Sequence, residues 1–330
     1  MSSDPVRAIA DAVLYEGYVL WPYRRSALKN QRRFTFGGVY PPSHSGRHPD
    51  DRSAITTEVL LEAHAQARVT VTARFLHVVR RTAAKRRGDA LEAVDEIVLG
   101  GERYLTWEEA REREVEVPAL ALARLRGGYI VPIEIAAGCE QEPLGDHAAL
   151  IREWSALRGE LRLEALPVED AAWRVSATIT NLTQFGGQGR AEALVLTFCS
   201  THMLLRVEGG AFASLADPPP HLAAAAAACR NEGSWPALVG DPVKRDQILS
   251  SPIILEDFPR VAPESPGDLF DGGEIDQLLI LNILALTDEE KAEMAATDAR
   301  ARDILERTHG LTPEQLMALH GTIREFGMAR

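Results

Sequence analysis

The chain has 330 residues and a mass of 36.1 kDa, enough for one large domain or two ordinary ones around a stable core. Because 45% of its residues are hydrophobic and 25% are charged, the composition excludes a disordered tail and a disulfide-stapled miniature fold. The net charge of −12 is uneven: residues 1–90 carry 15 Lys and Arg against 8 Asp and Glu (+7), whereas residues 91–330 carry 21 against 40 (−19). A basic N-terminal part and an acidic body favour docking in cis or an acidic protein partner, and they disfavour nucleic acid.

Hydropathy and cysteine usage predict a cytoplasmic protein without a membrane span. The first 13 residues lack a basic patch followed by an apolar core, and the longest apolar run, residues 275–286, is interrupted by polar residues. The three cysteines, Cys139, Cys199 and Cys229, are scattered and odd in number, which is typical of reduced thiols.

In chain order, the first predicted element is an amphipathic helix over residues 5–19, with Asp4 as its N-cap and Pro5 in its first turn. It runs into a segment over residues 15–42 that holds seven aromatic side chains, although only 6% of the chain is aromatic. Each aromatic side chain left in water forgoes roughly 1.5–3 kcal/mol of burial energy. We therefore expect this segment to be docked on folded protein.

A polar loop is predicted over residues 43–52. Its two histidines, His44 and His48, have a spacing that suits a metal only on a helix. Because Gly46 and Pro49 disfavour a helix, we expect neither a helix nor a metal site here.

Alternating apolar and polar residues from about residue 62 to residue 210 predict a sheet. The clearest strands are residues 68–79 and 173–180. We expect a basic turn or hairpin end at residues 80–87 and a short inserted helix at residues 146–158. Further predicted strands are residues 114–122, 129–136, 160–166, 193–198 and 203–207. Short strands without regular helices between them favour an α+β protein with an antiparallel β-sandwich-like core.

The last third of the chain is predicted to be mainly helical and packed on the sandwich. An alanine-rich helix is expected within residues 217–233, followed by a proline-rich strap at residues 250–266. Helices are then expected over residues 274–286 and after capping boxes at residues 287–290 and 312–315. The expected organisation is an N-terminal docking segment (1–60), a sandwich-like domain (61–210) and a C-terminal helical region (211–330).

Cys199 and His202 are one candidate metal site. They are three residues apart after an apolar run, and Cys139 or Cys229 could add a third ligand for zinc or another late first-row metal. A buried thiol beside a hydrogen-bonded histidine is the alternative interpretation. No cofactor is required by this pattern, and nothing in the sequence shows how the pKa of Cys199 would be lowered for nucleophilic catalysis.

A second candidate metal site is an acidic cluster around two adjacent glycines. Its carboxylates could bind a hard cation, or they could stabilise the start of the following helix through its dipole. The cluster consists of Asp268, Asp271, Glu274 and Asp276.

The aromatic and basic segment is the best candidate for a binding surface, since Tyr, Trp and Arg dominate protein interfaces. In the alternative interpretation the aromatics cover the sandwich while the arginines stack on them or pair with the acidic body. Both interpretations can hold together. The candidate partner-binding residues are Tyr15, Tyr18, Trp21, Tyr23, Arg24, Arg25, Lys29, Asn30, Arg32, Arg33 and Phe36.

Five strings along the chain carry a resemblance that extends over nearly its whole length: YEGYVLWPYRRSALKNQRRFTFGGVYPP, THMLLRVEGGAFASLADPP, ACRNEGSWPALVG, SSPIILEDFPRVAPESPGDLFDGGEIDQLL and TPEQLMALHGTIRE. Together they resemble a bacterial family of unassigned activity that is encoded beside nickel–iron uptake hydrogenases of the actinobacterial type. The resemblance implies an accessory, assembly or maturation role. The family has no established catalytic residues that could be assigned to positions in this chain.

We therefore expect a cytoplasmic, non-catalytic accessory protein that binds a protein partner, with a hydrogenase subunit or maturation factor as the partner that the resemblance implies. One alternative is a metal-dependent hydrolase that uses Cys199 and His202 or the acidic cluster. Another is a sugar- or lipid-binding sandwich, which would need a concave face lined by aromatic side chains.

Overall fold

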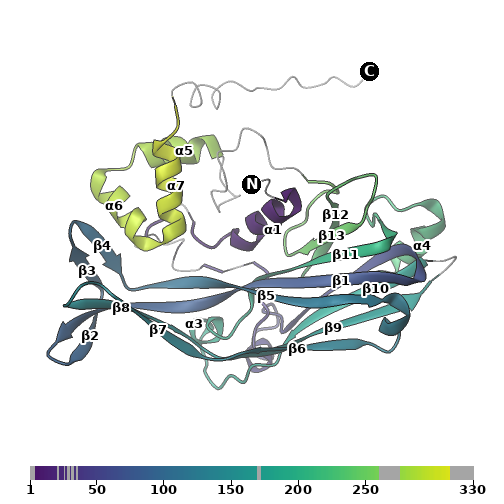
Figure 1. Cartoon of the computed structure of the whole chain (residues 1–330), viewed down its shortest axis with the longest axis horizontal. Coiled ribbons are helices and arrows are strands. Elements are labelled where there is room, and N and C mark those ends of the chain that lie inside the picture. The colour runs from purple at the N-terminus through teal and green to yellow at the C-terminus, as the bar shows by residue number, and fades with distance from the viewer. Residues whose placement is uncertain are drawn as a thin grey trace.

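One antiparallel sheet, built around a single long strand, forms the body of the protein (Figure 1). The computed structural model describes residues 4–20, 22–25, 27, 30, 33–34, 36–168, 172–259 and 276–312. Strand β1 (Ala54–Arg87) pairs along one side with β10, β5 and β2 in turn, and along the other side with β11 and β8. With helices at both ends of the chain, this confirms the predicted α+β, sandwich-like antiparallel fold.

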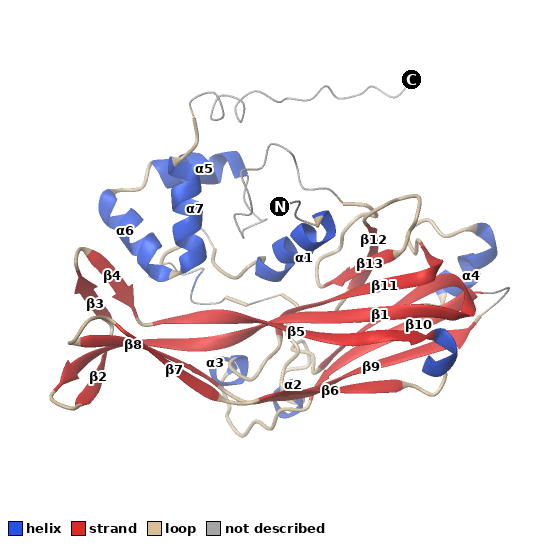
Figure 2. Ribbon diagram, in the orientation of Figure 1, coloured by secondary structure: helices blue, strands red, loops and turns tan. Residues whose placement is uncertain are grey.

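The strand order is β12-β13-β11-β1-β10-β9-β6, with β7 paired to β8 and with β3 and β4 as a separate hairpin (Figure 2). The remaining strands are β2 (Ala90–Val94), β3 (Glu96–Leu99), β4 (Glu102–Leu105), β5 (Trp107–Ala121), β6 (Tyr129–Ile135), β7 (Gly138–Pro143), β8 (Ala148–Trp154), β9 (Leu157–Pro167), β10 (Ala172–Asn181), β11 (Cys199–Ala213), β12 (Trp235–Val239) and β13 (Gln247–Ser251).

Residues 80–87 are a hairpin end and not a turn: they continue β1, whose last residues pair with β8 and form a hairpin with β2. Two other local predictions were wrong. Residues 146–158 are not a helix, because β8 lies between β1 and β7 and β9 begins at Leu157. Residues 193–198 are not a strand, since the short helix α3 (Arg190–Leu194) occupies the start of this run.

The region after residue 210 contributes two strands, β12 and β13, which extend the sheet beyond β11. The predicted alanine-rich helix is reduced to the 3₁₀ turn η3 (Pro220–Leu222) and the one-turn helix α4 (Ala223–Ala227). None of the five alanines of α4 is fully buried, and Ala225 and Ala226 pack only partly against the cluster around Leu60. The part of the predicted strap beyond residue 259 lies outside the described residues.

The main hydrophobic core lies between β1, β5 and β11 on one side and β6, β9 and β10 on the other. At its centre the rings of Phe75 and Phe198 stack with centroids 4.6 Å apart. Gly159 of β9 lies directly against this pair, because a Cβ there would come within 2.7 Å of the Phe198 ring. The 3₁₀ turn η2 (Leu122–Leu125) inserts two buried leucines into the same core.

Four helices cover the opposite face of β1 and β5 (Figure 1). Helix α1 (Pro5–Tyr15) is shorter than predicted but begins at the expected cap, where the Asp4 side chain accepts from the backbone N–H of Val6. The C-terminal helices are α5 (Asp276–Leu284), α6 (Asp288–Thr297) and α7 (Ala299–His309).

The Thr287–Glu290 capping box at the start of α6 is confirmed. The helix predicted after Thr312 lies outside the described residues. None of the described helices has the length and hydropathy that crossing a bilayer requires.

The predicted polar loop contains a single helical turn, α2 (Pro42–Ser45). His44 is fully buried there and hydrogen-bonds Asp51 at 2.8 Å, and its ring stacks on Tyr40 and His48. This turn was not predicted; Pro42 occupies its first position, where the missing N–H costs nothing. It ends before Gly46, so His44 and His48 do not share a helix, as expected.

Candidate functional site

The aromatic and basic segment is docked against the chain's own body. Tyr15, Tyr18, Tyr23 and Phe34 are all buried. They pack in one cluster with Leu76 and Val78 of β1 and with α5 and α7. The Tyr15 hydroxyl donates to Glu112 of β5 at 2.6 Å. The expected cis docking is therefore observed for the described part of the segment.

Tyr18 joins three separate parts of the chain. Its hydroxyl donates to the Asp298 carboxylate at 2.7 Å and accepts from the backbone N–H of Ala110 at 3.1 Å. Burial raises the pKa of both Tyr18 and Asp298, since desolvation disfavours their charged forms. Asp298 is also the N-cap of α7, so one hydrogen bond ties the N-terminal segment to the C-terminal helices.

Polar contacts hold the middle of the segment. The Asn30 amide donates to the carbonyls of Leu20 and Arg24 and accepts from the Leu20 N–H, which closes a tight loop. Arg24 pairs with Glu290 of α6 at 2.8 Å. Arg25 is more exposed and lies 3.6 Å from Asp95.

Arg33 is the most buried cation of the segment, at 5% exposure. Its guanidinium lies 3.8 Å from the centre of the Trp107 ring and donates to the backbone carbonyl of Glu108 at 2.7 Å and to that of Tyr18 at 3.4 Å. Among the described residues no carboxylate lies within ion-pair distance of it. Burial lowers the pKa of Arg33.

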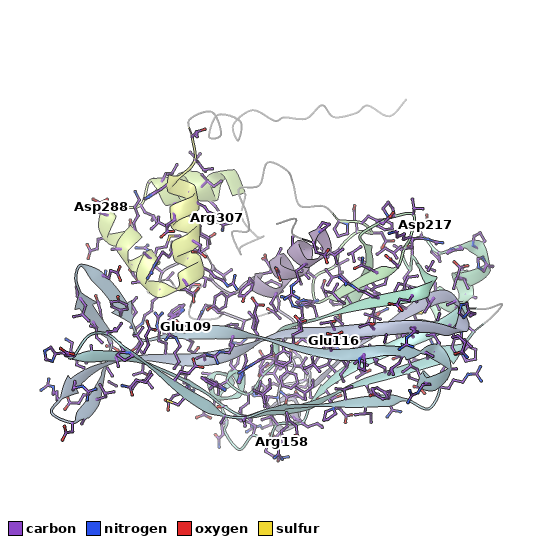
Figure 3. The ribbon with its side chains drawn as sticks, in the orientation of Figure 1. Glu109, Glu116, Arg158, Asp217, Asp288 and Arg307 are labelled. Atoms are coloured by element: carbon purple, nitrogen blue, oxygen red, sulfur yellow. The ribbon has the colours of Figure 1, made fainter. Side chains whose placement is uncertain are left out.

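A pocket of about 530 Å³ opens beside Arg33, between the segment, β1 and the start of β5. We call it the arginine pocket. Glu109, which is labelled in Figure 3 below α6 and α7, is the residue of β5 directly after Glu108 of the pocket. The pocket is lined by Arg25, Asn30, Arg33, Arg80, Arg81, Thr82, Thr106, Trp107 and Glu108.

The remaining partner-binding candidates differ in position. Phe36 is 41% exposed, and the Arg25 side chain is 39% exposed. Trp21, Lys29 and Arg32 lie outside the described residues. Within the described part, Arg25 and Phe36 are thus the candidates that offer most side-chain surface to another molecule.

Cys199 and His202 are both fully buried on β11. Burial raises the pKa of the Cys199 thiol to about 12, and its Sγ lies 3.7 Å from the Thr197 carbonyl. Burial, together with Arg74, lowers the pKa of His202 to about 3, and its Nδ1 lies 3.2 Å from the Ser200 carbonyl. These environments match the alternative interpretation of a buried thiol and a hydrogen-bonded histidine.

The other proposed metal ligands are not gathered around this pair. Cys139 is exposed on β7, and Cys229 packs in a separate cluster near α4. Within the described ranges, no three His, Cys, Asp or Glu side chains lie close enough together to hold a metal ion. Asp268, Asp271 and Glu274 lie outside those ranges, as does the side chain of Asp276.

Two features were not anticipated from the sequence. Arg74 of β1 is 1% exposed and pairs with Asp11 at 2.6 Å, Glu112 at 3.3 Å and Glu114 at 3.5 Å. The sequence offered one indication of this role, because Arg74 lies on a strand face that is otherwise rich in threonine. Trp107 had no signal of its own, because its partner Arg33 is distant in sequence.

No protein-family model matches this chain, and no curated protein matches its sequence. The molecule is an α+β, sandwich-like protein with an N-terminal segment docked in cis.

Proposed function

We propose that this protein is a non-catalytic accessory protein of the cytoplasm that binds a protein partner, with no role for nucleic acid. The partner that the resemblance of the sequence implies is a nickel–iron hydrogenase subunit or maturation factor. The observation that supports this proposal is that the aromatic and basic segment is held in place and still leaves Arg25 and Phe36 exposed.

A fixed segment is better suited to recognition than a mobile one. Ordering a side chain or loop on binding costs roughly 0.5–1.5 kcal/mol for each side chain that is immobilised. Here the Tyr18–Asp298, Arg24–Glu290 and Asn30–Leu20 contacts supply that order before a partner arrives. An Arg and an aromatic ring on such a surface are the residue types that contribute most to protein interfaces.

Support for a non-catalytic role comes from the state of the candidate reactive groups. A thiol with a pKa of about 12 is not a thiolate at neutral pH, so Cys199 is a poor nucleophile. The buried Nε2 atom of His202 has no hydrogen-bond partner among the described residues and is shielded from solvent.

A binding assay with matched variants tests this proposal. The immobilised protein would be presented in turn with purified hydrogenase subunits and maturation proteins. We expect one of them to be retained by the wild type and lost from the double variant Arg25→Glu/Phe36→Ser. The control is Arg245→Glu/Leu182→Ser, in which the Arg lies 3.8 Å from Glu62 and the Leu is 44% exposed, so it matches the test pair in exposure. Equal retention by both double variants would contradict the proposed surface.

A further inference from the structure

We propose that the arginine pocket is a binding site for a small molecule that carries an oxyanion, either a carboxylate or a phosphate. The pocket lies beside the docked segment and is formed by side chains from that segment, β1 and β5. This inference does not depend on the identity of any protein partner.

The first argument is the unbalanced charge of Arg33. A guanidinium stays protonated in a protein, and an isolated buried charge is costly unless it is paired. Arg33 is 5% exposed, yet its described partners are two backbone carbonyls and the rings of Trp107, Phe34 and Tyr18. None of these contacts is with a carboxylate, and the negative charges of Glu108 and Asp298 act on Arg33 only from beyond ion-pair distance. An oxyanion in the adjoining pocket would supply a negative charge in direct contact.

The second argument is that two other arginines at the pocket are only loosely paired. Arg25 lies 3.6 Å from the Asp95 carboxylate, whose own side chain is 91% exposed, and donates to the Asp95 backbone carbonyl at 3.4 Å. Arg80 lies 4.0 Å from Glu108 and is 55% exposed. Contacts of this length and exposure are weak, so both side chains can turn toward a ligand at little cost.

Arg81, in contrast to Arg25 and Arg80, is firmly paired. Its guanidinium donates to Glu109 at 2.7 Å and to the backbone carbonyls of Leu105, Ala296 and Thr297. It is therefore a structural residue that joins β1 to the end of α6. The ligand-binding cations of the pocket are Arg25, Arg33 and Arg80, and Glu108 is the one carboxylate among the described residues that line it.

The third argument is the size of the arginine pocket and the polarity of its lining. Trp107 is 8% exposed, and its indole N–H has no acceptor among the described residues. Its ring offers an apolar surface next to the cations. A pocket of about 530 Å³ with this combination suits an organic acid or a phosphate ester better than a bare ion. Arginine is also the side chain best adapted to carboxylate and phosphate groups, through paired N–H donors.

Titration of the full-length protein with inorganic phosphate and, separately, with malonate tests this inference. Ionic strength would be held constant with chloride, and binding would be followed by calorimetry and tryptophan fluorescence. We expect saturable binding of at least one of the two anions, and the stronger one indicates whether the site prefers phosphate or carboxylate ligands. The loss of one charge-assisted hydrogen bond in Arg80→Gln should weaken binding about tenfold or more.

Two further variants make the result specific. Arg87→Gln removes another exposed arginine from the same strand, at 74% exposure and away from the pocket, and should bind as the wild type does. Trp107→Phe keeps a ring beneath Arg33 but removes the indole, so it should abolish the fluorescence change. Saturable binding of neither anion, or equal affinity in Arg80→Gln and Arg87→Gln, would overturn the inference.

Discussion

Tyr18 and Asp298 are 280 residues apart in sequence, and their buried side chains share a hydrogen bond of 2.7 Å. The bond connects the docked N-terminal segment to the cap of the C-terminal helix α7. The segment and the C-terminal helices therefore stabilise each other on the same face of the sheet.

Removing the Tyr18 hydroxyl should destabilise the protein measurably. In Tyr18→Phe the buried Asp298 carboxylate loses this donor and keeps the backbone N–H of Arg300. Hydrogen bonds to charged groups contribute about 1.5–3 kcal/mol, and we expect a loss of that size in the free energy of unfolding, measured with urea. The control is Tyr104→Phe, whose hydroxyl donates to Glu102 in an exposed pair. A loss as large in the control would contradict the role assigned to burial.

The stability of the protein should fall in acid partly because of His202. Its pKa in the folded protein, about 3, is below its ordinary value of 6.5, so folding favours the neutral form. This contribution is fully present above about pH 6.5 and is lost as the pH falls toward 3. In His202→Gln the free energy of unfolding should therefore decrease less between pH 6.5 and pH 4 than in the wild type. His221→Gln, at an exposed position, is the control and should keep the wild-type slope.

The three carboxylates around Arg74 should contribute non-additively. Each is 40–48% exposed, so a single change such as Asp11→Asn should cost less than about 1 kcal/mol while the other two remain. Neutralising all three, in Asp11→Asn/Glu112→Gln/Glu114→Gln, leaves Arg74 buried without a counter-charge. We expect this variant to lose about 3–5 kcal/mol. Chemical denaturation of the single, double and triple variants measures the coupling, and simple additivity would contradict it.

The three thiols should react with an alkylating reagent in a fixed order. Cys139 is exposed, Cys229 is half-buried with a pKa raised by burial to about 11, and Cys199 is fully buried with a pKa of about 12. Mass spectrometry of the native protein at neutral pH should find Cys139 modified first and Cys199 modified only after unfolding. Early modification of Cys199 would contradict the inert thiol described here and reopen the question of a reactive site.

Local patterns in the sequence determined the elements whose signals lie within a few residues. The Asp4-Pro5 start of α1, the Thr287–Glu290 capping box of α6 and the alternation of β6 and β10 were all readable from the chain. Composition also predicted that the aromatic segment would be buried, because the energy of ring burial depends little on which surface covers the ring.

Only the tertiary structure decided the features that depend on partners far along the chain. β1 extends to Arg87 because β8 and β2 pair with its end, and neither pairing is visible in the local pattern of residues 80–87. The arginine pocket likewise requires Arg33 to lie on Trp107 and beside Arg80, three residues from separate elements. A sequence records which side chains are charged, but the distance from each charge to its neighbours arises only when the chain folds, and that distance separates a paired cation from a candidate binding site.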